Sequence, residues 1–256
     1  MNEIEMHEVT DEFQRCWSAA GSHIQALAQG AHVSWLRVDL APPFLDHLSF
    51  RLGNQLFFLR LLDVDGNLET PGNLSGLQYI TEGCNGRACL MPMKRMPDGW
   101  KVYTQGWGLV DASTKQPLDP PSVISSEKIE MTDWELLDFA VQIVRNHIAD
   151  KLGYDIMSFQ SNPSLDPSIW FVGDNGPEWV TVRAVRYPKL EAAMPPNIKD
   201  IAKNCIGQGK VGHFASVSVA NSEDAFDPDE NIPALPLWRG HGLFPRFEGL
   251  LPAILQ

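Results

Sequence analysis

The stretch DPSIWFVGDNGPEWVTVRAVRYP (residues 166–188) decides how the second half of this chain folds. It contains two runs rich in β-branched and aromatic residues, a composition typical of strands. The sequence DNG (residues 174–176) separates them, and these residue types tolerate the backbone of a tight turn. Four charged residues mark this predicted hairpin: Asp166 opens the first strand, Glu178 follows the turn, and Arg183 and Arg186 lie near the end.

The segments around this hairpin predict a helix–strand–strand–strand–helix–strand order. MTDWELLDFAVQIVRNHIADKLG (residues 131–153) has apolar residues at helical spacing, and Thr132 before Glu135 fits a capping box. We expect the remaining strand, the second helix and a strand with one buried face at YDIMSFQSNP (154–163), PPNIKDIAKNCIGQG (195–209) and HFASVSVAN (213–221).

The first half of the chain predicts a helix followed by an antiparallel sheet. Residues 10–29 place apolar side chains at helical spacing. In HLSFRLGNQLFFLRLLDVDG (residues 47–66), Gly-Asn separates two apolar runs, which predicts a hairpin whose second strand is buried on both faces. We also expect a strand at residues 32–40 and a short helix at 73–82.

A polar segment rich in Pro and Ser separates the two halves. Residues 116–127 lie within it, and we interpret them as a linker or surface loop. It divides a first domain over residues 1–115 from a second over 128–256 that ends in an irregular tail. The predicted fold class is α+β, with antiparallel or mixed sheets, flanking helices and a C-terminal half of order αβββαβ.

The composition argues against several functions. The 256 residues carry a formal net charge of −12 and no basic run, and an acidic surface repels phosphate, which disfavours nucleic acid as a partner. No apolar run approaches the length that spans a membrane, so no membrane partner is expected. The acidic amino terminus lacks the apolar core of a signal peptide, and the four cysteines are expected as thiols, which predicts a cytoplasmic protein.

The element order over residues 131–221, with Asp166 opening a strand, resembles the core of the PD-(D/E)XK nuclease-like family. In that family an acidic residue opens the second strand and a Glu-x-Lys motif lies on the third. The carboxylates hold Mg²⁺, the lysine orients the attacking water, and a glutamate of the first helix sometimes joins the metal site. The resemblance implies that Asp166 and Glu178 are metal ligands for Mg²⁺ and that Glu135 is the helix acid.

The chain departs from the family's motif on the third strand. If Glu178 is the motif's glutamate, Val180 stands where the lysine belongs; if Arg183 replaces the lysine, Thr181 stands where the glutamate belongs. The candidate catalytic residues are Asp166, Glu178, Arg183 and Glu135. The alternative is structural: Asp-Pro is common turn chemistry, a glutamate at a strand edge is usually solvated, and Arg183 pairs with a nearby acid.

A second candidate site lies in LWRGHGLFPRF (residues 237–247). There Arg239 and His241 place a cation and an imidazole beside glycines that allow close approach to a ligand. The alternative is a tail strand with a glycine kink. Three further segments offer either a metal site or a turn or solvated loop, namely CNGRAC (84–89), SEDAFDPDEN (222–231) and DVDG (63–66).

Together these observations predict a non-catalytic binding or regulatory protein, whose partner is an unknown protein or small ligand. The alternative is a metal-dependent nuclease or phosphodiesterase that uses Asp166, Glu178 and Arg183. A third hypothesis is an interaction protein that forms a homodimer through exposed aromatic residues such as Trp170 and Trp179.

Overall fold

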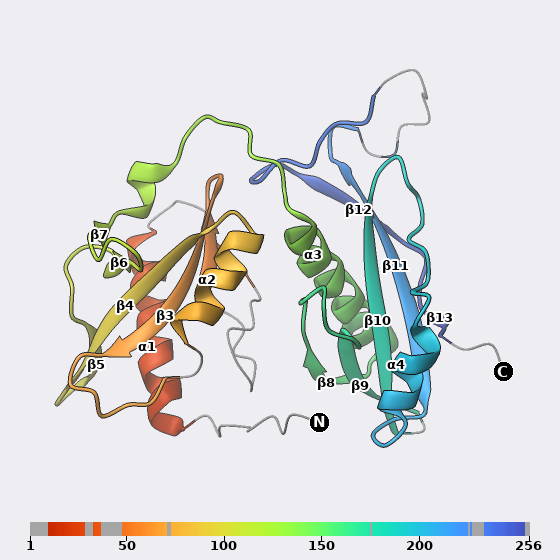
Figure 1. The fold of residues 1–256 in the computed structure, drawn as a ribbon, viewed down its shortest axis with the longest axis horizontal. Coiled ribbons are helices and arrows are strands. Elements are labelled where there is room, and N and C mark those ends of the chain that lie inside the picture. The colour runs from red at the N-terminus through yellow and green to blue at the C-terminus, as the bar shows by residue number, and fades with distance from the viewer. Residues whose placement is uncertain are drawn as a thin grey trace. The chain divides into compact units, whose positions relative to one another are not determined.

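The computed structural model describes residues 10–28, 33–36, 48–70, 73–174, 176–224, 226 and 233–253. The chain divides into two compact units, an N-terminal unit (Met1–Ile129) and a C-terminal unit (Glu130–Gln256). Each unit combines helices with a mixed sheet, so the predicted α+β class is confirmed (Figure 1). None of the helices in the described ranges combines the length and apolar character that crossing a membrane requires.

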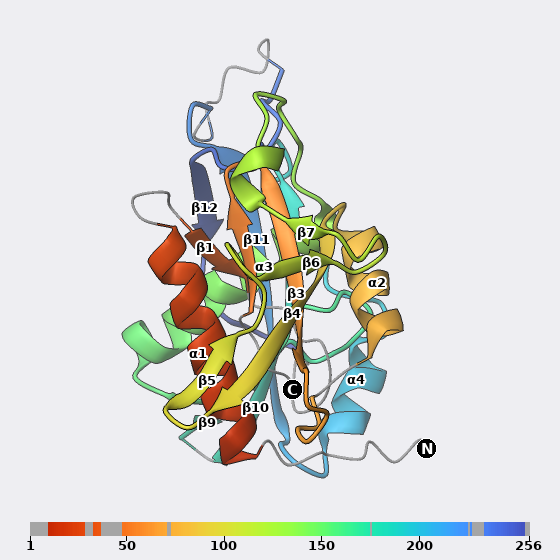
Figure 2. The ribbon, with the colours of Figure 1, turned by 90° about the vertical axis from the view of Figure 1, so that its left-hand side faces the viewer.

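The N-terminal unit has one helix on each face of its sheet (Figure 2). Helix α1 (Asp11–Leu27) begins where the Thr10 hydroxyl accepts the N–H of Phe13 over 3.1 Å, as N-cap residues do. Helix α2 (Leu74–Gly83) lies on the opposite face. The described strands follow the order β1-β2-β3-β4-β6-β7, with β5 beside β4. They are β1 (Val33–Leu36), β2 (Ser49–Leu52), β3 (Gln55–Asp63), β4 (Arg87–Met96), β5 (Gly99–Val102), β6 (Leu109–Asp111) and β7 (Pro117–Leu118).

Strand β3 is the buried centre of this sheet, as predicted. Phe57 and Leu59 pack in the α1 core, while Leu56 and Phe58 point to the other face and are equally buried. Strands β2 and β3 form the predicted hairpin. However, β3 and β4 run parallel, so the prediction of an antiparallel sheet is wrong at this pair. The reason is α2, which carries the chain back across the sheet as a crossover. Of the strand expected at residues 32–40, all but Val33–Leu36 lies outside the described residues.

The segment expected to be a linker or loop is part of the N-terminal unit. It contains β7, which pairs with β6, and a short 3-10 helix (Pro120–Val123). The Asn54 side chain holds the end of this segment, because its Nδ2 donates to the Glu127 carbonyl over 2.7 Å and to the Ser125 hydroxyl over 3.0 Å. The boundary between the units therefore falls after residue 129.

Up to residue 221 the C-terminal unit has the predicted αβββαβ order, but the tail that was predicted to be irregular adds two strands to the sheet, so that prediction is wrong. Helix α3 (Asp133–Asn146) carries the predicted capping box, in which Thr132 and Glu135 each bind the other's backbone N–H. A π-helical turn (His147–Leu152) extends it, and the second helix is α4 (Ile198–Cys205). The sheet order is β12-β11-β10-β9-β8, with β13 beside β11; β10 and β11 are parallel, and the other pairs are antiparallel. The strands are β8 (Asp155–Phe159), β9 (Ile169–Gly173), β10 (Gly176–Arg186), β11 (Val211–Asn221), β12 (Leu243–Phe247) and β13 (Leu251–Pro252).

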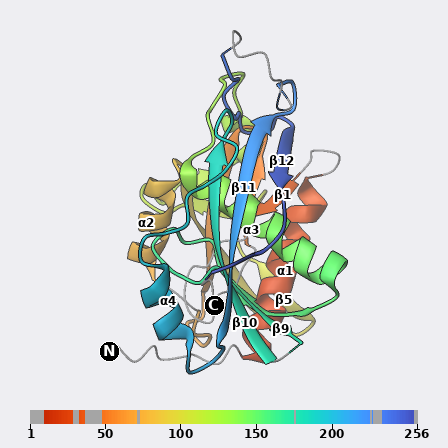
Figure 3. The same cartoon turned by 90° about the vertical axis from the view of Figure 1, so that its right-hand side faces the viewer.

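Helices α3 and α4 cover opposite faces of this sheet (Figure 1, Figure 3). Val180 and Val182 of β10 pack in the α3 core, whereas Trp179 packs with α4. Because both faces are covered, the prediction that β11 has one buried face is wrong. Ser218 is fully buried, and its hydroxyl donates to the Lys189 carbonyl over 2.6 Å. Trp179 is also fully buried, so the expectation that it is exposed for dimerisation is wrong.

Candidate functional site

The side chains of Asp166 and Arg183 meet beside β10. Arg183 donates from Nη1 to Asp166 Oδ1 over 3.0 Å and from Nη2 to Oδ2 over 2.6 Å. This two-point geometry is the strongest arrangement an arginine and a carboxylate form. The same Nη1 also donates to the carbonyl of Val182 over 2.8 Å. Both oxygens of the carboxylate that was expected to bind a metal therefore contact a cation.

Glu178 is buried near the start of β10, on the face that α3 covers. Its Oε2 lies 2.6 Å from Nε2 of His213 on β11, and the ring of Phe171 lies 5.8 Å from the imidazole. Gly173 makes room for this pair, because a Cβ there would overlap the Glu178 carboxyl. The side chain of Glu178 is only 11% exposed, so the alternative of a solvated edge glutamate is wrong. The turn residue Asn175 nearby lies outside the described residues.

Glu135 and Arg239, one from each predicted site, form a buried ion pair with each other. Arg239 Nε lies 3.0 Å from Glu135 Oε1 and its Nη2 lies 2.8 Å from Oε2, with the side chains 1% and 5% exposed. The pair joins the first turn of α3 to the segment before β12, so the side chain of Arg239 points into the interior. His241 is exposed, and its backbone N–H donates to the Trp238 carbonyl.

The three predicted acids do not converge on one point. Glu178 and Arg183 are separated by an odd number of positions on β10, so their side chains leave opposite faces of the sheet. Each acid instead has its own cationic or imidazole partner: Arg183, His213 or Arg239. Within the described ranges, no three His, Cys, Asp or Glu side chains gather as metal ligands do. These residues therefore do not fit the Mg²⁺ that the resemblance implies.

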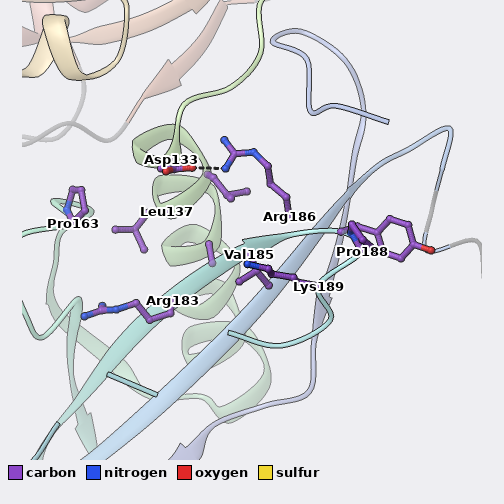
Figure 4. Close-up of a pocket in the computed structure, with 11 residues that line it drawn as sticks. Asp133, Leu137, Pro163, Arg183, Val185, Arg186, Pro188 and Lys189 are labelled. Carbon is purple, nitrogen blue, oxygen red and sulfur yellow. Dashed lines mark hydrogen bonds and ion pairs between the residues drawn. The ribbon is translucent and has the colours of Figure 1, made fainter. Parts of the chain in front are cut away.

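A pocket of about 570 Å³ lies beside the second half of β10 (Figure 4). Its size is typical of ligand sites. The apolar part includes Leu136 and Leu137 of α3 and Pro163. The charged part comes from β10 and the turn after it. The lining residues there and on α3 include Asp133, Arg183, Arg186 and Lys189.

The pocket exists because β9 is shorter than β10. Their pairing ends at Ile169 and Val180, but β10 continues to Arg186. The Val180 carbonyl accepts from Ser168 N–H, and the Val182 N–H donates to the Ser168 hydroxyl, so even-numbered residues direct their backbone groups toward the β9 side. The next of these is Ala184, a pocket residue. Among the described residues, the register provides no strand partner for Ala184 on that side.

The cations of the pocket differ in how firmly they are held. Arg186 donates to Asp133, whose side chain is 89% exposed, and to the Met131 carbonyl over 2.6 Å. Its Nε also lies 3.6 Å from Oε1 of Glu130, which is 53% exposed. An ion pair with such an exposed carboxylate exchanges its partner at small cost. Lys189 is exposed on the turn, and within the described part of the chain no ion pair engages its ammonium group. The lining thus has three cations and one acid in a chain of net charge −12.

Sequence reasoning missed this pocket, although one signal was present. The second run of the hairpin spans eleven residues as β10, and the first spans five as β9. A strand that extends so far past its hairpin partner leaves an edge open unless another strand covers it.

The smaller motifs form turns where they are described. The Asp63 carboxylate of DVDG accepts the N–H groups of Asp65, Asn67 and Leu68 over 2.8–3.0 Å. Cys84 and Cys89 of CNGRAC are buried and form no disulfide. Of the segment 222–231, only residues 222–224 and 226 are described, so the expected calcium site or loop lies mostly outside the described residues.

Comparison with curated proteins gave no match, and comparison with solved structures gave none either. One protein-family model matches the chain from α3 to the residue after β13. The matched part includes β10 and all the residues that line the pocket except Asp133. Over residues 134–253, this chain is similar to a family described as a domain of unknown function (DUF8840).

Proposed function

We propose that this chain is a non-catalytic binding or regulatory protein and that the pocket beside β10 holds its ligand. The observation that carries the proposal is the bidentate pair of Arg183 with Asp166. A carboxylate held in this way is a poor ligand for a divalent cation, because a metal would first have to displace the guanidinium.

The other two acids support the same proposal. Glu178 contacts His213, and Glu135 is used twice, by the helix cap and by Arg239. A nuclease of the resembling family needs its carboxylates to share one cation with oxygen distances of roughly 2.0–2.6 Å. The pocket, in contrast, combines an apolar wall with cationic groups and an open strand edge, which suits recognition of a ligand.

The alternative remains a metal-dependent nuclease or phosphodiesterase, and a cleavage assay separates the two. The full chain is incubated with single- and double-stranded DNA and RNA in Mg²⁺ or Mn²⁺, beside an Asp166→Asn variant. The proposal predicts no cleavage by either protein. Metal-dependent cleavage by the wild-type chain would overturn the proposal. Loss of that cleavage in Asp166→Asn would assign it to a site that uses Asp166, and equal cleavage by both proteins would assign it to another site.

The proposal also includes a reducing, cytoplasmic location. It is supported by the four cysteines, Cys16, Cys84, Cys89 and Cys205, which are all buried and form no disulfide.

A further inference from the structure

We infer that the open edge of β10 binds an extended peptide segment that adds one strand and presents an acidic side chain to Arg186 and Lys189. The inference rests on the proposed binding role of the pocket and specifies its ligand. A strand edge that is not paired offers backbone donors and acceptors to a peptide, which is a common mode of peptide recognition.

The backbone of β10 sets where the added strand pairs. The Val182 carbonyl already accepts from Arg183, and the Arg186 carbonyl accepts the N–H of Lys189. Ala184 lies between these two residues on β10. Its N–H and C=O point toward the β9 side, as the Val180 carbonyl and the Val182 N–H do. A peptide residue opposite Ala184 therefore exchanges two hydrogen bonds with it, as in an antiparallel ladder.

The faces of the sheet set which side chains the peptide carries. Cross-strand neighbours lie on the same face, so the residue opposite Ala184 points to the α3 side, where Leu136 and Leu137 line the pocket. An apolar residue suits that position. The residue two positions away, opposite Arg186, points to the same face and meets the guanidinium. An acidic residue suits this second position.

Charge complementarity supports an acidic rather than a basic peptide. Arg186 contacts two exposed acids, Asp133 (89% exposed) and Glu130 (53% exposed, 3.6 Å from Nε), so an incoming carboxylate competes with weak partners. Lys189 adds a second cation at this end of the pocket. The rest of the molecule has the opposite bias, because the net charge of −12 attracts basic peptides. Preference for an acidic peptide therefore reports the pocket and not the overall charge.

The test uses fluorescein-labelled heptapeptides and anisotropy with the full chain. The probe Thr-Glu-Thr-Val-Thr-Glu-Thr places an apolar residue two positions from an acid in both directions, and Thr-Lys-Thr-Val-Thr-Lys-Thr is its matched control. We expect the acidic probe to bind at least about tenfold more tightly than the basic one. Equal affinity, a preference for the basic probe, or no binding by the acidic probe at the highest attainable protein concentration would overturn the inference.

Backbone pairing is tested on the peptide, so the protein is not altered. N-methylation of the central valine removes the donor opposite Ala184, and methylation of a neighbouring threonine removes a donor that points away from β10. Strand addition predicts that the first change abolishes binding and the second leaves it within about twofold. Equal loss at both positions would exclude a paired strand.

Three protein variants test the charges. Lys189→Glu is expected to weaken binding of the acidic probe about tenfold. Lys199→Glu, on the exposed side of α4, is the control and is expected to leave the affinity unchanged. Asp133→Asn is expected to strengthen binding severalfold, because Arg186 loses one of its two acidic partners and keeps only Glu130. If Lys189→Glu and Lys199→Glu have equal effects, the pocket is not the site. If the peptide tests fail and the chain has no nuclease activity, only the inference of an acidic peptide ligand is refuted. Metal-dependent cleavage would refute the proposed binding function itself.

Discussion

Arg183 of β10 donates to both carboxylate oxygens of Asp166, over 3.0 and 2.6 Å. Asp166 was predicted to open the first strand of the hairpin, but it lies three residues before β9 begins. The side chains are 27% and 13% exposed, so the pair is partly shielded from water. The pair lies where the pairing of β9 with β10 ends, and Arg183 also donates a hydrogen bond to the Val182 carbonyl there. The residue that most resembles a catalytic acid in the sequence is therefore part of the structure that shapes the pocket.

The coupling between these two side chains is measurable. A double-mutant cycle of Asp166→Ala and Arg183→Ala is expected to give about 1–2 kcal/mol in the free energy of unfolding, because the pair is bidentate and partly buried. With lysine in place of Arg183, the coupling energy to Asp166 is expected to be less than half of that with arginine, since an ammonium group cannot make both bonds. The exposed pair of Lys101 and Asp98 is the control, and its coupling is expected to be much smaller because water surrounds both groups. A coupling no larger than that control would contradict the role given to Arg183.

Glu135 and Arg239 are expected to be far more sensitive to mutation. Arg239→Ala leaves a buried carboxylate without its cation, so we expect the free energy of unfolding to fall by about 3–5 kcal/mol in urea denaturation. Arg246→Ala breaks an exposed pair with Glu248 and is expected to cost less than about 1 kcal/mol. If the two variants lose similar free energy of unfolding, the buried pair is no more important for stability than the exposed one.

Asp111 gives the N-terminal unit a predictable dependence on pH. Its carboxylate accepts the backbone N–H of Thr114 over 2.7 Å and that of Ser113 over 2.9 Å, and these bonds hold the pKa of Asp111 below its usual range. A lowered pKa in the folded state adds stability above the unfolded pKa, and this stability is lost as the pH falls through the folded value. Asp111→Asn should therefore lower the free energy of unfolding by about 1 kcal/mol at pH 7 and by almost nothing well below pH 4. A difference that is constant between pH 7 and pH 2.5 would refute this assignment.

The four thiols are expected to be inert in the folded protein. Burial raises the pKa of Cys16 to about 12 and that of Cys205 to about 11, and it raises the pKa of Cys89 as well. Because the thiolate is the reactive form, we expect no reaction with a disulfide reagent at pH 8. All four should react after unfolding in guanidinium. Rapid labelling of any one of them in the native state would show that its side chain is accessible.

Much of the fold was predictable because it is encoded locally. The capping box of Thr132 and Glu135 predicts the start of α3 from residues within one turn. The Gly53–Asn54 turn predicts the β2–β3 hairpin. The parallel pairing of β3 and β4 was missed, because it depends on how α2 returns the chain and not on any local pattern.

The candidate site was less predictable, since its contacts join distant parts of the sequence. Glu178 pairs with His213 and Glu135 with Arg239, and no local spacing connects those residues. One feature was readable: an odd separation between Glu178 and Arg183 on one strand places them on opposite faces. That alone excludes a shared site on one face of β10.

The most direct test of the central claim is calorimetric titration of the full chain with Mn²⁺, beside Arg183→Ala and Asp166→Asn. If Arg183 holds the Asp166 carboxylate as the structure indicates, the wild-type chain shows no saturable binding that depends on Asp166. Saturable Mn²⁺ binding by the wild-type chain that is lost in Asp166→Asn would contradict the account, because a metal and not Arg183 would then be the partner of that carboxylate.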